Sequence, residues 1–190
     1  PRLHGLFAVL AATNLAYHFP PLMVVLGQLS ARPELTDAAI ITRSVYRHLM
    51  MRPEVLANVL HFVLASAAVT GLLLMHLTSR QAPQSTEQHN SQLVSGGAWI
   101  ALVASTTQLA AGTWVLMQLP SSARNSLVGD DWLGTCLFVL SIGTAFGAMH
   151  TLSGVAMGET SNAAVWRSTV LILAVVFLMA GTPERARGVR

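Results

Sequence analysis

Five nearly uncharged apolar stretches follow one another along the chain, and each is long enough to cross a lipid bilayer as an α-helix. A hydrocarbon core about 30 Å thick needs roughly 20 residues at a rise of about 1.5 Å per residue. The stretches lack the alternating pattern of an outer-membrane barrel, and lipid offers exposed backbone groups no hydrogen-bond partner. The pattern therefore predicts an all-α integral membrane bundle, a single membrane domain over 1–190, with five transmembrane helices at 3–26, 55–77, 97–119, 132–157 and 162–181.

The distribution of arginines predicts the orientation of these spans. Eight arginines lie on the face that carries the C-terminus and three lie on the other face. Because cytoplasmic connections carry an excess of basic residues, we expect the N-terminus outside and the C-terminus in the cytoplasm. The first apolar run lacks a basic leader segment before it, so we expect it to be a retained helix. The expected location is the inner (cytoplasmic) membrane of a bacterium, as a multi-pass protein.

The two long connections between spans differ in character. The cytoplasmic one predicts an interfacial helix over 36–51, capped by Thr36, with apolar Ile41, Val45 and Leu49 on one side and Arg43 and Arg47 on the other. Such a helix suits anionic lipid, and a helix that docks on a partner has the same composition. The external connection, 78–95, is polar and rich in turn-forming residues, which predicts an exposed loop.

Composition removes several classes of protein. Charged residues make up 10% of the chain and hydrophobic residues 53%, against roughly 25% charge in soluble domains. All eleven basic residues are arginine and none forms a run, so nucleic acid is not an expected partner. Membrane lipid is. The single cysteine, Cys136, has no partner for an intramolecular disulfide.

Histidines within the spans are the candidate functional residues. His4 and His18 share the first span at a spacing of 14, and His61 and His76 share the second at a spacing of 15, which returns each pair to within about 40–60° of one face. Measured from the external surface, His18 and His61 lie at depths of about 22 and 24 Å, while His4 and His76 lie within about 2 Å of it. The spacing therefore predicts two histidine pairs at two levels.

Paired imidazoles from neighbouring helices are the axial ligands of a b-type haem. We expect His18 and His61 to ligate the haem iron, with Asn14 and Asn58, each one turn before a histidine, orienting the rings. Pro20 and Pro21 are expected to kink the first span next to the site. The alternative is structural, because a histidine in a span can simply bond a neighbouring carbonyl group. Zinc and copper are disfavoured, since no Asp or Glu lies well inside a span.

The second site has several candidates. His4 and His76 compete with His150 of the fourth span, which follows a GxxxG pattern, Gly143 to Gly147, that suits either helix packing or a flat macrocycle. The third span carries a polar group near mid-membrane that suits either interhelical hydrogen bonds or the headgroup of a quinone: Ser105, Thr106, Thr107 and Gln108.

The opening Pro1-Arg-Leu-His-Gly-Leu-Phe, followed by His18, resembles the start of the five-helix cytochrome b membrane subunit of succinate dehydrogenases and fumarate reductases. The length, the five spans and the histidines at His18, His61 and His150 are also similar to that family. The stretch from His61 to Gly71 resembles small bacterial haem b membrane proteins. The resemblance implies one or two haems b and quinone reaction in the membrane. The third span has Gln108 in place of the histidine that the family uses.

These patterns favour a b-type haem subunit that carries electrons within a larger respiratory or photosynthetic complex. Its soluble segments are too short to hold a flavin or iron–sulfur module, so substrate chemistry is expected in partner redox subunits. Two alternatives stay open. One is a cofactor-free structural or assembly subunit that packs by small-residue faces, and the other is a small transporter or channel, which is disfavoured by the lack of acidic or basic residues in mid-span.

Overall fold

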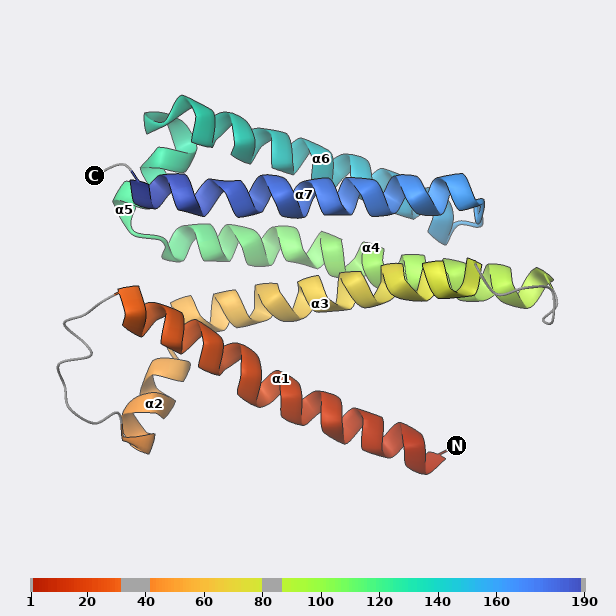
Figure 1. Ribbon diagram of the computed structural model, residues 1–190, viewed down its shortest axis with the longest axis horizontal. Coiled ribbons are helices and arrows are strands. Elements are labelled where there is room, and N and C mark those ends of the chain that lie inside the picture. Colours follow the sequence, from red (N-terminus) through yellow and green to blue (C-terminus); the bar gives the residue numbers. More distant parts are fainter. Residues whose placement is uncertain (1, 32–41, 80–86, 189–190) are drawn as a thin grey trace. The chain divides into compact units, whose positions relative to one another are not determined.

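The structure, a computed structural model, describes residues 2–31, 42–79 and 87–188, and the described part is helical with no strand (Figure 1). The elements are α1 (Arg2–Ala31), α2 (Arg43–Met50), α3 (Pro53–Ser79), α4 (Glu87–Gln118), α5 (Ser121–Asn125), the π-helical turn η2 (Ser126–Asp130), α6 (Trp132–Ala156) and α7 (Asn162–Gly188). The all-α prediction is confirmed for these residues.

Five of the helices are long and apolar enough to cross a membrane. The candidate spans are Leu3–Ser30, Pro53–Ser79, Gln88–Gln118, Trp132–Ala156 and Asn162–Gly181. Each predicted span overlaps one of them. Many large apolar side chains on these helices are exposed, among them Val139, Phe146 and Phe177, as expected of helices whose outer faces meet lipid.

The sequence predicts an exposed loop over 78–95. Residues 80–86 lie outside the described residues, and for the rest of the segment the prediction is wrong. α3 continues to Ser79, and α4 begins at Glu87, ten residues before the predicted span. The short polar side chains of this segment bond to the neighbouring helix and turn, because Ser95 Oγ donates to the Val155 carbonyl at 3.1 Å and Ser91 Oγ lies 3.5 Å from Thr160 Oγ1. Polarity here reflects contacts between elements, so it is no signal of a loop.

The chain divides into two compact units. The first contains α1, α2, the start of α3 up to Val63 and the end of α4 from Ala111, and the second contains the remainder. The core of the first unit is Val25, Leu29 and Val55, with Tyr46 and Leu49 of α2 packed against it. The core of the second unit joins α3, α4, α6 and α7: Leu72, Met75, Val94, Ala98, Ala101, Leu152, Val155, Ala156, Ala164 and Val165.

Within the second unit, α3 and α4 cross closely at two glycines. A Cβ atom at Gly71 would lie 2.5 Å from the Gly97 carbonyl oxygen, and a Cβ atom at Gly97 would lie 2.7 Å from the Gly71 carbonyl oxygen. The two backbones therefore touch, as small residues permit in membrane helix pairs. The GxxxG pattern of α6 is different, because nothing lies within 4 Å of a Cβ atom placed at Gly143 or Gly147.

Two local features of the fold involve proline and glycine. α1 runs as one continuous helix through Pro20 and Pro21, and the predicted kink there stays a prediction. η2 precedes α6, and Gly129 within it has φ of 152°, a backbone conformation that only glycine adopts readily. Asp131 then caps α6 by accepting a hydrogen bond from the Leu133 backbone N–H at 3.2 Å.

Candidate functional site

His18 lies on α1 with its ring hydrogen-bonded to its own helix. Its Nδ1 is 3.0 Å from the Asn14 carbonyl oxygen, and since a carbonyl only accepts, Nδ1 is the donor. In a neutral imidazole this places the lone pair on Nε2. Tyr17 packs edge-on against the ring, with the two centroids 5.0 Å apart. The ring is therefore held in the tautomer that presents Nε2 as a ligand.

The contact between Asn14 and His18 differs from the predicted one. The sequence suggested its side-chain amide, whereas the backbone carbonyl of Asn14 makes the contact with the His18 ring. Asn58 donates from Nδ2 to the Glu54 carbonyl oxygen at 2.7 Å, within α3. The predicted role of the Asn58 amide in orienting an imidazole stays a prediction.

His61 lies on α3 against a glycine of α4. A Cβ atom placed at Gly112 would lie 3.5 Å from Cε1 and 3.7 Å from Nδ1 of His61, and no other atom lies within 4 Å of it. Nδ1 is shielded from solvent, and the ring is half-buried. One edge of the imidazole therefore lies beside Gly112, at an ordinary contact distance from where a Cβ atom would be, and Nε2 lies outside this contact.

His18 and His61 belong to the same unit and lie at matching levels. α1 and α3 meet where Val25 and Leu29 pack against Val55. His18 is seven residues before Val25 and His61 is six residues after Val55, which places them about 10.5 and 9 Å from that contact along antiparallel helices. His18 shares the face of Val25, at a spacing of seven, while His61 is turned about 120° from Val55.

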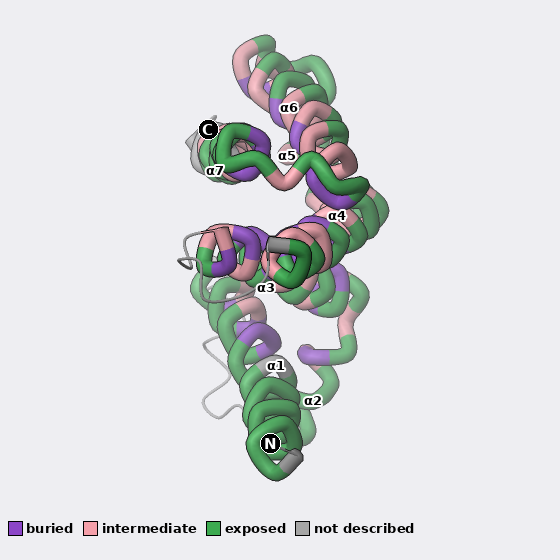
Figure 2. The backbone as a smooth tube through the Cα atoms, turned by 90° about the vertical axis from the view of Figure 1, so that its right-hand side faces the viewer, coloured by how far each residue is buried: buried purple, intermediate pink, exposed green. Residues whose placement is uncertain are grey.

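The two rings are close in level but not in contact. No hydrogen bond or ring contact joins His18 to His61 within the described residues, and the His18 side chain is exposed. Indeed every described side chain from Leu3 to Phe19 of α1 is exposed (Figure 2). This stretch contains His4, Asn14 and His18 among exposed apolar side chains.

His76 belongs to the second unit, where it ties α3 to α7. Its Nε2 lies 2.8 Å from Thr169 Oγ1, whose own hydrogen is donated to the Val165 carbonyl oxygen at 3.0 Å. Nε2 of His76 is therefore a donor and carries the proton. The Trp166 ring packs edge-on at 4.9 Å. The predicted use of His76 with His4 as a second ligand pair stays a prediction, and Nε2 is engaged in this arrangement.

Replacing Thr169 by valine should lower the free energy of unfolding by about 0.5–2 kcal/mol, because His76 loses its acceptor while the side-chain shape is kept. Thermal unfolding in mild detergent measures the change. Thr107→Val is the matched control, since the hydroxyl of Thr107 donates only to Val103 of its own helix. Equal stability of the two variants would contradict a structural role for His76.

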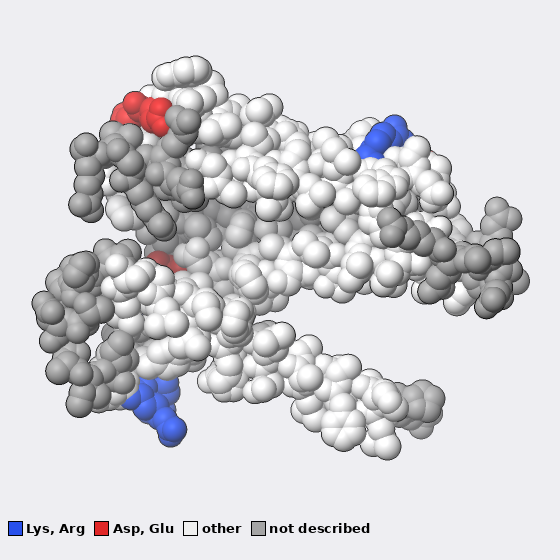
Figure 3. All heavy atoms as spheres, viewed as in Figure 1, with Lys and Arg blue, Asp and Glu red and all other residues white. Residues whose placement is uncertain are grey.

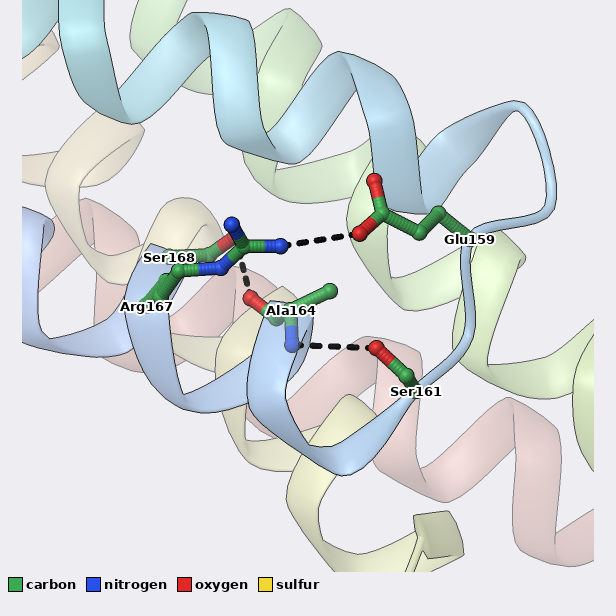
Figure 4. A network of polar contacts seen from close by, with 5 residues as sticks. All are labelled: Glu159, Ser161, Ala164, Arg167 and Ser168. Atoms are coloured by element: carbon green, nitrogen blue, oxygen red, sulfur yellow. Dashed lines mark hydrogen bonds and ion pairs between the residues drawn. The ribbon is translucent and has the colours of Figure 1, made fainter.

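His150 lies exposed on α6 beside the turn into α7. It borders a shallow groove of about 300 Å³ with Thr151, Ser153, Gly154, Met157, Glu159 and Arg167. Figure 4 shows the Arg167 guanidinium donating to Glu159 Oε1, at 2.8 Å. The carboxylate folds over Gly154, where a Cβ atom would lie 2.9 Å from Glu159 Oε2. His150 belongs to the second unit, and its predicted use as a ligand of a second site stays a prediction.

The polar group of the third span bonds largely along its own helix. Thr106 Oγ1 donates to the Leu102 carbonyl oxygen and lies 3.5 Å from Met149 Sδ of α6, and Thr107 Oγ1 donates to the Val103 carbonyl oxygen. The contact of Thr106 with Met149 fits the interhelical alternative, whereas Thr107 bonds within α4. A quinone headgroup at this group stays a prediction.

Sequence reasoning missed the glycines at close contacts and the threonine that pairs with His76. Gly112 beside His61, Gly71 and Gly97 at the α3–α4 crossing, and Thr169 beside His76 were not singled out. The spacing of Gly97 and Ala101, a small-xxx-small pattern, was a usable signal for the crossing. No sequence signal marked Gly112, because its contact with His61 depends on which face of α4 meets α3.

The chain matches no protein-family model, no curated protein and no solved structure. Within the described residues, no three His, Cys, Asp or Glu side chains gather as metal-ion ligands. A haem, in contrast, needs only one or two protein ligands.

Proposed function

We propose that the chain is a multi-pass membrane subunit that holds a b-type haem on His18 and His61 and carries electrons within a larger complex. The observation that carries this proposal is the pair of histidines at one level of one unit, with the Nδ1 of His18 donating to the Asn14 carbonyl group. Histidines that bind metal commonly donate their other ring N–H to a carbonyl group in this way.

The residues present fit such a group. His18 carries its lone pair on Nε2, which is the nitrogen that an iron would take, and the Nδ1–H bond fixes the tautomer and raises the basicity of the ligand. His61 lies against Gly112 by its Nδ1–Cε1 edge, and because glycine has no side chain, nothing at position 112 crowds the ring. The exposed apolar side chains of α1 around His18, such as Leu15, would keep water away from the proposed site.

A bound haem would supply reversible one-electron transfer, and the chain's own residues would set its potential through the axial rings and their hydrogen bonds. The apolar faces of α1 and α3 would keep water from the rings. Electrons would enter and leave through partner redox subunits, because the segments between the spans are too short for a second redox module. A quinone is the proposed small-molecule partner, in keeping with the resemblance to cytochrome b subunits.

We further propose that the five spans place the N-terminus outside and the C-terminus in the cytoplasm of a bacterial inner membrane, from the arginine bias. Labelling with a membrane-impermeant maleimide in intact spheroplasts tests this orientation. In a Cys136→Ser background, Met157→Cys at the α6–α7 turn should react, and Ser122→Cys on α5 should react only after permeabilisation. The reverse pattern would contradict it.

A structural or assembly subunit is the second candidate. It is favoured by the open face of α6, where nothing approaches Gly143 and Gly147. A neighbouring subunit with a matching small-residue face would pack there. Haem content separates the two candidates. Protein purified from cells supplied with haem should yield a b-type haem on solvent extraction, whereas folded protein that yields none would favour the structural subunit.

A further inference from the structure

α2 is a short helix that is docked by one face on the first unit. Tyr46 and Leu49 pack against the cluster of Val25, Leu29 and Val55, and the next residue, Met50, is buried. Thr42 caps the helix by accepting a hydrogen bond from the Val45 backbone N–H. The predicted cap, Thr36, and residues 36–41 of the predicted interfacial helix lie outside the described residues. The orientation of α2 on α1 and α3 is therefore fixed by its buried face.

Beside its buried face, α2 has an exposed basic face. Arg43 and Arg47 lie one turn apart, with His48 beside them. Figure 3 shows basic atoms gathered over α2. Among the described residues no carboxylate pairs with Arg43 or Arg47, since the nearby Glu54 pairs with Arg52 at 3.3 Å. Two large apolar side chains of this segment are also exposed: Val45, on the other side of α2 from the arginines, is 47% exposed, and Met51, just after the helix, is 62% exposed.

We infer that this basic face of α2 binds the headgroups of anionic phospholipids at the membrane surface. α2 connects the end of α1 to the start of α3, so it lies level with the headgroups if those two helices are membrane spans. Two guanidinium groups one turn apart, which pair with no carboxylate among the described residues, suit neighbouring phosphates, and Val45 and Met51 suit the acyl boundary beneath them. The inference rests on the proposed membrane placement and is independent of the haem.

A protein partner fits this face less well. A stable protein interface buries upwards of about 1,000 Å², which is more than the free face of an eight-residue helix offers. The attraction to an anionic surface, in contrast, acts on each arginine separately. Exposed apolar residues beside arginines are also favourable at a lipid surface, where both kinds of side chain find their preferred surroundings.

Retention of phosphatidylglycerol against phosphatidylcholine tests the inference. The full chain is purified from mixed micelles that hold equal amounts of both lipids, and the retained lipids are quantified by mass spectrometry. The wild type should retain phosphatidylglycerol preferentially. Arg43→Gln/Arg47→Gln should lower that preference by about fivefold for each arginine, from the attraction of a basic residue to an anionic surface.

Matched variants separate the effect of charge on lipid retention from effects on folding and on haem binding. Arg167→Gln, which replaces the arginine that pairs with Glu159, should retain the lipid as the wild type does, and Arg43→Lys/Arg47→Lys should keep most of the preference. The haem content of the Arg43→Gln/Arg47→Gln variant should be unchanged. Equal retention of both lipids by the wild type, or an equal loss in Arg167→Gln, would overturn the inference and leave this face to a protein partner.

Discussion

Replacing Gly71 by alanine should lower the free energy of unfolding by about 1–3 kcal/mol, the usual cost of overpacking a close contact. The added methyl group would lie 2.5 Å from the carbonyl oxygen of Gly97 and 2.7 Å from the backbone nitrogen of Ala101. Both atoms belong to the backbone of α4, so neither can turn aside as a flexible side chain would. α3 and α4 must therefore separate along the crossing that forms part of the second unit's core.

Gly143→Ala on α6 is the matched control for this prediction. Nothing lies within 4 Å of a Cβ atom there, and alanine favours a helix over glycine by up to about 1 kcal/mol. This variant should be as stable as the wild type or slightly more stable. Unfolding by titration with a denaturing detergent, followed by circular dichroism, measures both. A Gly71→Ala variant as stable as Gly143→Ala would contradict the close crossing of α3 and α4.

Replacing Gly112 by leucine should abolish haem binding while the chain still folds. The imidazole of His61 occupies the space beside Gly112, and a branched side chain there would push the ring away from its position. A misplaced axial ligand weakens or breaks its bond to the iron. The haem content of the purified variant and its elution volume in gel filtration measure the two parts of this prediction.

Two controls make the effect specific to His61. Gly112→Ala should keep the haem, because its methyl group would meet Cε1 and Nδ1 at 3.5 and 3.7 Å, ordinary contact distances. Gly96→Leu, on the same helix with nothing within 4 Å of its Cβ position, should keep it as well. If Gly112→Leu retained the haem of the wild type, the assignment of His61 as a ligand would be wrong.

The helices were predictable because their signal is a local one. Apolar runs of about 20 residues reveal spans without any knowledge of packing, and all five predicted spans overlap long apolar helices. Their ends were less predictable. The first residues of α4 are polar, as a loop would be, yet Ser95 bonds to the Val155 carbonyl group, a partner 60 residues away. Polarity in one segment cannot reveal such a contact.

The contacts of the candidate residues could not be predicted from the sequence. Helical spacing predicts one level for His18 and His61, and their pairing stays a prediction. The ring of His18 bonds to a backbone carbonyl group, and every residue carries one, so no sequence signal marked Asn14 for that reason. His76 was placed by depth alone, whereas its contact with Thr169 depends on how α7 packs on α3.

The most direct test of the account is a reduced-minus-oxidised visible spectrum of the purified chain, recorded beside His18→Ala, His61→Ala and the control His48→Ala on α2. The account predicts the α-band of a b-type haem in the wild type and in His48→Ala, and its loss in both His18→Ala and His61→Ala. A flat spectrum from folded wild-type protein supplied with haem, or a band that survives in either of those two variants, would contradict a haem held between His18 and His61.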